Sequence, residues 1–442
     1  MSHRRRPRRP VPVIDGPVTV EDLAQDGRGV ARVGGKVLFV AGALPGERVR
    51  VRVLRAHREF NEAETTSIEL ASPDRVAPAC PHFGVCGGCA LQHLAPAAQV
   101  AFKQKQLVDA LARIGNVRAD EIAAPVTGPV WHYRRRARLG VRWVYKKERA
   151  LVGFRERDAP KIAILTRCDT LDERVGLRLE ALSALVGGLS IRERIPQIEV
   201  AAAESHVALV WRVLAPPTAE DRAALSAFAG REGFAFYLQS GGADSLEALP
   251  PLRPPLSYSP DGSAIRLRFA PLDFVQVNVA VSQQMVRQAL AWLAPEPGAP
   301  LLELFSGIGN FSLPLAAAGA HVTAVEGEAA LVERARANAR TNGLEIRFER
   351  ADLFAPAASA PWLDAASGGV LLDPPRAGAQ EILSQVAERA PPRILYVSCH
   401  PGTLARDAGT LVRVHGYHLR RAGVLDMFPH TAHVESMALF ER

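Results

Sequence analysis

The stretch LLELFSGIGN, from Leu301 to Asn310, decides the fold of the C-terminal part of this chain. Its first five residues form an apolar run that predicts a buried strand, and a helix is expected from Phe311. Gly307 and Gly309 let the backbone between strand and helix approach a ligand closely, which is typical of a nucleotide-type pocket. The motif does not choose the ligand, because NAD-dependent enzymes share it.

Three further predicted strands each end in an acid: His321–Val325 in Glu326, Ile346–Arg350 in Asp352, and Gly369–Leu372 in Asp373. Glu326 lies 19 residues beyond Gly307, where an acid can accept both hydroxyls of a ribose, and Asp352 is placed to reach an adenine edge. Ser312 stands where a dinucleotide motif has its third glycine. With the Asp-Pro-Pro-Arg sequence at 373–376, this favours S-adenosylmethionine over NAD.

Composition and charge divide the chain into two parts. The 442 residues are 48% apolar and 23% charged, which excludes collagen, coiled coil and global disorder. Residues 1–294 carry a net charge of +11 and residues 295–442 a net charge of −3. This asymmetry predicts a polyanion-binding part followed by a part that performs chemistry. We expect residues 1–10 to be a disordered basic tail.

The sequence has no apolar run long enough to span a membrane and no signal peptide, so we expect a cytoplasmic protein. We also expect it to be a monomer. Short β-runs at residues 11–71 predict a small barrel. In Arg48–Leu54 arginine alternates with apolar residues, which predicts one cationic face suited to a phosphate backbone.

An amphipathic helix is expected over Ala97–Ile114, with its apolar stripe running to Ile114.

Cys80, Cys86 and Cys89 are spaced C-x5-C-x2-C, and Cys168 follows later in the chain. Four thiolates fit a tetrahedral zinc or an iron–sulfur cluster, and the spacing alone leaves these two equally open. His82 and His93 are alternative zinc ligands, although ordinary loop histidines are the simpler interpretation. The fifth cysteine, Cys399, follows the β-run Arg393–Val397, at the end of a strand where open α/β sheets place their sites.

A strongly basic segment, Trp131–Phe154, interleaves arginines with aromatic residues. Its members are Arg134, Arg135, Arg136, Arg138 and Arg142, set among Tyr133 and Trp143. This mixture suits single-stranded RNA, and a solvated strand face is an equal alternative for any one arginine.

Five segments together carry a family resemblance: the four cysteines above, Gly307–Asn310, Asp373–Arg376, Ser398–Pro401, and Asp426–Ser436. They resemble those of the RNA uracil-C5 methyltransferases, and more narrowly those of the bacterial 23S rRNA 5-methyluridine enzymes. The resemblance implies an α/β multidomain protein with three parts. These are a TRAM (OB-like) β-barrel at 11–71 that binds RNA, a central α+β domain with a [4Fe–4S] cluster at 72–270, and a class I, Rossmann-like methyltransferase domain at 271–442.

The same resemblance implies the functional residues. Cys399 would be the nucleophile and Glu435 the base. The binding site for S-adenosylmethionine would comprise Gln276, Phe305, Asn310, Glu326, Asp352 and Asp373, and the cluster ligands would be Cys80, Cys86, Cys89 and Cys168. His400 departs from the family pattern, which more often has Asn after the cysteine. Ser306 also departs, where Cys is frequent.

This chemistry needs a thiolate, because uracil C5 becomes nucleophilic only after a nucleophile has added at C6. A carboxylate must then remove the C5 proton. We expect local positive potential, with Arg376 as one source, to lower the pKa of Cys399 from its free value of about 8.5. The target nucleotide must be turned out of the RNA stack to be reached.

Three other functions remain open at this stage. The same chemistry could act on tRNA, although the barrel and the cluster cysteines favour rRNA by resemblance. A non-catalytic iron–sulfur RNA-binding protein would be expected to lack the thiol or the carboxylate, and both are present. A dehydrogenase predicts a third glycine and no thiol after the strand.

Overall fold

The computed structural model describes residues 11–355 and 360–442, so the basic tail predicted at residues 1–10 lies outside the described residues. The chain divides into two compact units. Of the described residues, one unit comprises 11–103 and 429–433, and the other 104–355, 360–428 and 434–442. In the described part of the chain, no helix is both long and apolar enough to cross a membrane.

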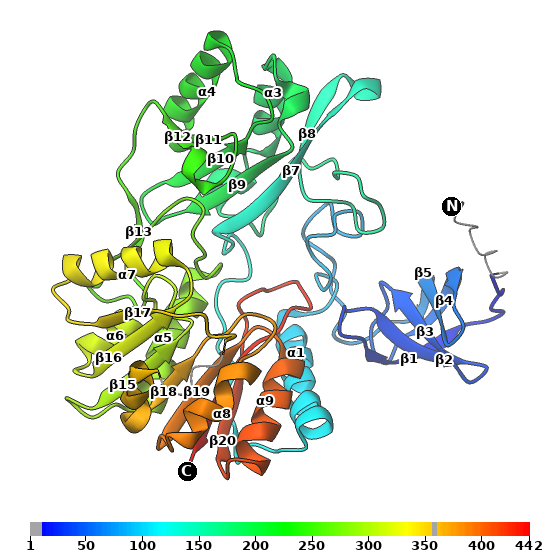
Figure 1. The fold of residues 1–442 in the computed structure, drawn as a ribbon. Coiled ribbons are helices and arrows are strands. Elements are labelled where there is room, and N and C mark those ends of the chain that lie inside the picture. Colours follow the sequence, from blue (N-terminus) through cyan, green and yellow to red (C-terminus); the bar gives the residue numbers. More distant parts are fainter. Residues whose placement is uncertain (1–10, 356–359) are drawn as a thin grey trace, which may run out of the picture. The chain divides into compact units, whose positions relative to one another are not determined.

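A closed β-barrel forms most of the first unit (blue in Figure 1). Its strands pair in the order β1-β2-β3-β5-β4. Val20, Val40 and Val49 are fully buried and alternate with more accessible residues along their strands, as a half-buried strand requires. The small barrel predicted from the sequence is confirmed. The bounds are β1 (Val18–Leu23), β2 (Gly29–Val33), β3 (Lys36–Ala41), β4 (Arg48–Ala56) and β5 (Phe60–Leu70).

The alternation predicted for β4 is confirmed, because Arg48, Arg50 and Arg52 are exposed. The neighbouring strand β5, which the sequence analysis did not predict, brings acids beside this cationic face. Arg48 and Arg50 lie 3.0 and 2.9 Å from Glu69, and Arg52 pairs with Glu64. These pairs are exposed and contribute little stability each. They do neutralise much of the charge that the sequence assigned to a phosphate backbone.

The helix predicted over Ala97–Ile114 is α1 (Pro96–Ala110), followed by one π-type turn at Leu111–Gly115. Leu107 and Leu111 are buried as expected, whereas Ile114 is 53% exposed. The predicted apolar stripe therefore ends one turn early, because the π-type turn rotates Ile114 away from the packed face.

A six-stranded sheet in the second unit has the order β12-β11-β10-β9-β7-β8. The basic segment of the sequence forms two of these strands, β7 (Arg136–Val144) and β8 (Arg149–Gly153). The other strands are β9 (Gln197–Ala202), β10 (Val207–Arg212), β11 (Phe234–Gln239) and β12 (Leu246–Leu249); the helices are α2 (Glu173–Gly176), α3 (Leu179–Gly188) and α4 (Ala219–Glu232). A separate pair, β13 (Leu256–Tyr258) and β14 (Leu267–Phe269), follows.

The eight-stranded sheet has the order β17-β16-β15-β18-β19-β21-β20-β6. Its strands are β6 (Glu121–Ile122), β15 (Pro300–Leu304), β16 (His321–Glu326), β17 (Arg347–Arg350), β18 (Val370–Leu372), β19 (Arg393–Ser398), β20 (His418–Leu425) and β21 (Glu435–Glu441). Strands β15 to β19 are parallel, and β21 runs antiparallel to both β19 and β20. This parallel core with glycine turns and alternating helices is the Rossmann-like sheet expected for the C-terminal part.

Helices cover both faces of this sheet (Figure 1). Alternate residues of its strands belong to two different hydrophobic clusters. Leu371 and Leu395 pack with α5 (Val279–Leu293), α6 (Ser312–Ala317) and α7 (Ala329–Thr341). Their neighbours on the same strands pack with α8 (Gln380–Glu388) and α9 (Pro401–Arg413). Because both faces are buried, the carboxyl ends of the strands are where side chains can meet a ligand.

Candidate active site

The glycine turn after β15 adopts a backbone conformation that L side chains seldom take. Phe305, Gly307 and Gly309 have φ of 64°, 55° and 97°. A Cβ at Gly309 would lie 2.5 Å from Leu313 Cδ1, so only glycine fits there. The strained φ at Phe305 turns the chain sharply at the end of the strand. The turn thereby exposes its backbone toward the space above the sheet.

Glu326, at the end of β16, is held against this turn. One of its carboxylate oxygens accepts the backbone N–H of Gly307 at 3.0 Å, and the other accepts that of Glu328 at 2.9 Å. On the next strand, Asp352 accepts the N–H of Phe354 at 3.0 Å. The rings of Phe354 and Phe305 lie 5.8 Å apart and form an apolar wall beside these acids.

The sheet order places five of the six predicted donor-site residues in a row at the carboxyl ends of the strands. Asp352 follows β17, Glu326 ends β16, Phe305 and Asn310 follow β15, and Asp373 follows β18. The sixth, Gln276, lies in the segment before α5. The Tyr258 hydroxyl donates to Asn310 Oδ1 at 3.0 Å, and Arg135 Nε donates to the Gln276 carbonyl at 2.5 Å.

Strand register brings Cys399 and Glu435 together. In the antiparallel pair β19–β21, Ser398 lies opposite Ser436. The next pair outward is therefore Cys399 with Glu435, at the carboxyl end of β19. Cys399 is half-buried, and Glu435 is 8% exposed rather than a surface carboxylate. Two residues that are remote in the sequence thus meet at one position beside Asp373.

The turn that presents Cys399 is fixed by its neighbours. The Ser398 hydroxyl contacts both the N–H and the carbonyl of His400 at 3.1 Å. His400 is the N-cap of α9, and its Nδ1 accepts the backbone N–H of Thr403 at 3.2 Å. An asparagine oxygen would accept the same N–H. The departure from the family pattern at His400 therefore keeps the helix cap.

The electrostatics of the thiol differ from the sequence expectation. Burial and the negative charges of Glu435 and Asp373 raise the pKa of Cys399 to about 11, and the opposing effect of Arg376 is smaller. The expected direction was wrong, first because the fold buries the thiol, and second because the ends of two other strands place Glu435 and Asp373 beside it. Burial and Glu435 in turn raise the pKa of Asp373 to about 7. Cys399 is therefore a protonated thiol at neutral pH in the ligand-free protein.

This arrangement predicts a steep pH dependence for alkylation of Cys399. The thiolate is the reactive form, so the rate with iodoacetamide should rise about ten-fold per pH unit between pH 7 and 10. Glu435→Gln removes a negative neighbour and lowers the pKa of the thiol, so alkylation at pH 8 should be several-fold faster. Peptide mass spectrometry separates Cys399 from the other cysteines. A flat profile from pH 7 to 9 would contradict the raised pKa.

The sequence analysis missed one buried acid of the site, Glu303 on β15. Its side chain is 1% exposed and is hydrogen-bonded to the Ser312 hydroxyl at the start of α6. Burial is the main reason that its pKa rises to about 8, and the negative charges of Asp373 and Glu326 add to the effect. The sequence did contain a signal for this residue, because Glu303 is the one acid within the apolar run 301–305. Glu303 thereby joins β15 to the first turn of α6.

The basic segment of the sequence is divided by the fold. Arg138 is exposed and pairs with Glu199 at 3.2 Å, and Arg142 is exposed. Arg135, by contrast, is 3% exposed. Arg134 and Arg136 are intermediate in exposure. The interpretation as an RNA surface is therefore wrong for the buried Arg135, and for the exposed Arg138 and Arg142 it stays a prediction.

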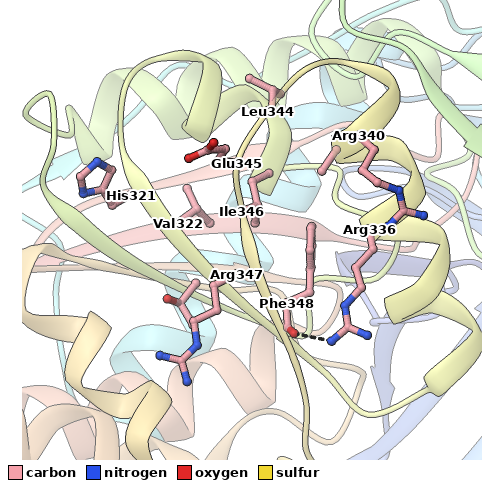
Figure 2. A pocket seen from close by; sticks show the side chains of 11 residues that line it. His321, Val322, Arg336, Arg340, Leu344, Glu345, Ile346, Arg347 and Phe348 are labelled. Atoms are coloured by element: carbon pink, nitrogen blue, oxygen red, sulfur yellow. Dashed lines mark hydrogen bonds between the residues drawn. The ribbon is translucent and has the colours of Figure 1, made fainter.

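A pocket of about 570 Å³ lies at the opposite end of β16 and β17 (Figure 2). His321, Arg340 and Arg347 line it, and none of the predicted site residues does. Arg336 donates to the Phe348 carbonyl and pairs with Glu333, and Arg347 pairs with Glu349. This pocket lies away from the carboxyl ends of the strands, where the predicted site residues are.

None of the cysteines in the described part of the chain forms a disulfide. Cys86 Sγ accepts the N–H of Gly88 at 3.4 Å, and Cys168 Sγ lies 3.3 Å from Thr170 Oγ1. Hydrogen bonds of this kind stabilise thiolate ligands. Across residues 11–355 and 360–442, no three His, Cys, Asp or Glu side chains are grouped so as to hold a metal ion.

Comparison with known proteins identifies the family. The tRNA (Uracil-5-)-methyltransferase family matches residues 259–354 and 363–442, and the TRAM domain family matches residues 17–66. The 23S rRNA (uracil(1939)-C(5))-methyltransferase RlmD of Alkalilimnicola ehrlichii is 51% identical over 100% of this chain and 99% of its own length. RlmD of Methylococcus capsulatus is 49% identical over the full length of both chains.

A solved structure shares the fold. The tRNA (uracil-54, C5)-methyltransferase of Pyrococcus abyssi, in complex with S-adenosyl-L-homocysteine, superimposes with a TM-score of 0.73 at 23% identity. The match covers 96% of this chain and 99% of that one. The fold and site define an S-adenosylmethionine-dependent methyltransferase. The chain belongs to the bacterial 23S rRNA (uracil-C5)-methyltransferases, within the wider RNA uracil-C5 methyltransferase family.

Proposed function

We propose that this protein methylates C5 of a uridine in 23S rRNA through a covalent bond between Cys399 and C6 of the uracil. The observation that carries the proposal is the β19–β21 register, which sets Cys399 beside Glu435. The match over the whole chain to the two RlmD proteins supports 23S rRNA as the substrate.

The residues of the chain divide the reaction between them. Cys399 releases its proton to solvent water, and its sulfur adds to C6, which makes C5 nucleophilic. The methyl donor supplies a sulfonium-bound methyl group, which C5 takes up. Glu435 then accepts the C5 proton, and the thiolate of Cys399 leaves C6 as the double bond re-forms. The rise in the pKa of Cys399 means that its proton must leave as the site fills, because little thiolate is present beforehand.

The donor would lie across the carboxyl ends of β15 to β18. Glu326 is positioned for the ribose hydroxyls and Asp352 for the adenine edge. Gln276, Phe305, Asn310 and Asp373 would complete the site.

The other parts of the chain serve the RNA in this proposal. The TRAM barrel at 11–71 and the central domain at 72–270 would hold the RNA, and residues 271–442 would hold the donor and perform the chemistry. The basic tail at 1–10 would add phosphate contacts. An enzyme of this kind would act as a monomer in the cytoplasm, where its substrate is made.

Cys80, Cys86, Cys89 and Cys168 would hold a [4Fe–4S] cluster. The three loop cysteines lie within ten residues, and the hydrogen bonds to the sulfurs of Cys86 and Cys168 suit thiolate ligands. No step of the methyl transfer uses the cluster. Its role would be to support the fold or to shape the RNA surface.

Anaerobic purification should yield a brown protein with about four irons per chain. Iron and acid-labile sulfide would be measured together with the absorbance near 400 nm. Cys80→Ser should lower the iron content severely, whereas Cys399→Ser, which changes a cysteine outside the set, should leave it unchanged. A colourless protein that contains one zinc would reject the cluster.

The function is tested by incubating the purified protein with S-adenosylmethionine and 23S rRNA from a strain that lacks the gene. We expect one 5-methyluridine per rRNA, located by nuclease digestion and mass spectrometry. Total tRNA serves as the competing substrate. Modification of tRNA alone would overturn the rRNA assignment, and modification of neither RNA would favour the non-catalytic alternative.

A further inference from the structure

A buried arginine and a buried tyrosine lie behind the donor site, and the reaction described above does not use them. Arg135 is 3% exposed and Tyr258 is 2% exposed. The guanidinium carbon of Arg135 lies 4.1 Å from the centre of the Tyr258 ring, which is cation–π contact. Among the described residues, no acid lies within ion-pair distance of Arg135, whose two terminal nitrogens have no hydrogen-bond partner; Glu204 acts on it only from farther away. A buried cation without a carboxylate partner is costly, which indicates a specific role.

Both residues reach the donor site directly. The Tyr258 hydroxyl donates to Oδ1 of Asn310, in the glycine turn. Arg135 Nε donates to the carbonyl of Gln276, and the backbone N–H of Arg135 donates to Val277 at 3.0 Å. One arginine thus holds the backbone at Gln276 and acts on Asn310 through the tyrosine.

The cation determines which way the Asn310 amide faces. A guanidinium over the ring draws electron density from the phenol, which makes its O–H a better donor and a poorer acceptor. Tyr258 therefore selects the carbonyl oxygen of the Asn310 amide. Nδ2 of Asn310 must then face the other way, and it is buried with no hydrogen-bond partner in the described residues. A buried amide N–H₂ without a partner requires an acceptor oxygen.

We propose that Arg135 and Tyr258 are positioning residues, which hold the Asn310 amide so that Nδ2 donates to an oxygen of the methyl donor. The carboxylate of the donor's amino-acid portion is an acceptor of this kind. The inference rests on the proposed donor site. It deepens that proposal by giving Arg135 and Tyr258, which precede the methyltransferase sheet in the sequence, a role in binding the donor. The sequence analysis had interpreted Arg135 as a residue of an RNA-binding segment.

The test is the affinity for S-adenosylhomocysteine, measured by titration calorimetry. Tyr258→Phe removes one hydroxyl and should weaken binding about ten-fold, the equivalent of one charge-assisted hydrogen bond. The turnover number at saturating donor should stay within about two-fold. Tyr237→Phe on β11 is the matched control, and it should bind as the wild type does.

A double-mutant cycle separates positioning from general loosening. Asn310→Ala should weaken binding as Tyr258→Phe does, and adding Tyr258→Phe to it should produce no further loss. Arg135→Lys keeps the positive charge but loses the planar guanidinium over the Tyr258 ring, so its loss of affinity for S-adenosylhomocysteine should be smaller than that of Tyr258→Phe. This variant replaces Tyr258→Phe in the test if Tyr258→Phe folds poorly. Two results would overturn the positioning role of Arg135 and Tyr258: wild-type affinity in Tyr258→Phe, or losses of affinity in Tyr258→Phe and Asn310→Ala that add fully in the double variant. Failure of the wild type to bind S-adenosylhomocysteine would instead overturn the proposed donor site.

Discussion

Replacing Cys399 with alanine should lower methylation by a factor on the order of 10⁴ or more, because the uracil ring then has no nucleophile to activate C5. Methyl incorporation from labelled S-adenosylmethionine into 23S rRNA measures the loss. Affinity for S-adenosylhomocysteine should stay within about two-fold of the wild type, since the six predicted donor-site residues are unchanged.

Cys399→Ser is the matched variant for this experiment. It preserves the size of the side chain and the hydrogen bonds that Ser398 makes to His400. A serine hydroxyl is a far weaker nucleophile at neutral pH, so this variant should be nearly as inactive as Cys399→Ala. Methylation by either variant at a rate near that of the wild type would contradict the assignment of the nucleophile.

Glu435→Gln should have the opposite effect on the covalent complex, which should accumulate. Glutamine cannot take the C5 proton, so the thiol cannot be expelled after methyl transfer. Loss of the negative charge also lowers the pKa of Cys399, so addition to C6 is not impaired. We expect a large fraction of the protein to migrate with labelled RNA on a denaturing gel.

Two controls accompany this experiment. The double variant Cys399→Ala with Glu435→Gln should form no adduct, because the bond to RNA needs the sulfur. Omitting S-adenosylmethionine should reduce the amount of stable adduct, since reversal remains open until the methyl group is transferred. Full turnover by Glu435→Gln would show that another group removes the proton.

The sequence predicted the architecture of the catalytic sheet well, because that information is local. The apolar run 301–305, its glycine turn and the acids at the strand ends are each encoded in a few adjacent residues. The position of Cys399 after a strand was also predicted correctly. Cys399 meets Glu435 only because β21 pairs antiparallel with β19 in one particular register. The hydrophobic periodicity of the sequence does not specify that register.

Charges were predicted less well, since their effect depends on what the fold brings beside them. The arginines of β4 looked like a cationic face until β5 placed Glu64 and Glu69 next to them. Arg135 looked like its exposed neighbours, although it packs under Tyr258 in the fold. The direction of the Cys399 pKa depends in the same way on Asp373 and Glu435, which arrive from two other strands.

The most direct test of the central claim is the mass of the complex formed with RNA that carries 5-fluorouridine at the methylated position. Fluorine cannot leave as a proton does, so the reaction should stop after methyl transfer with the ring still attached to the enzyme. We predict a tryptic peptide containing Cys399 that carries a methylated, fluorinated uridine. If the wild-type protein methylates ordinary uridine but never forms this crosslinked peptide, covalent catalysis by Cys399 is contradicted.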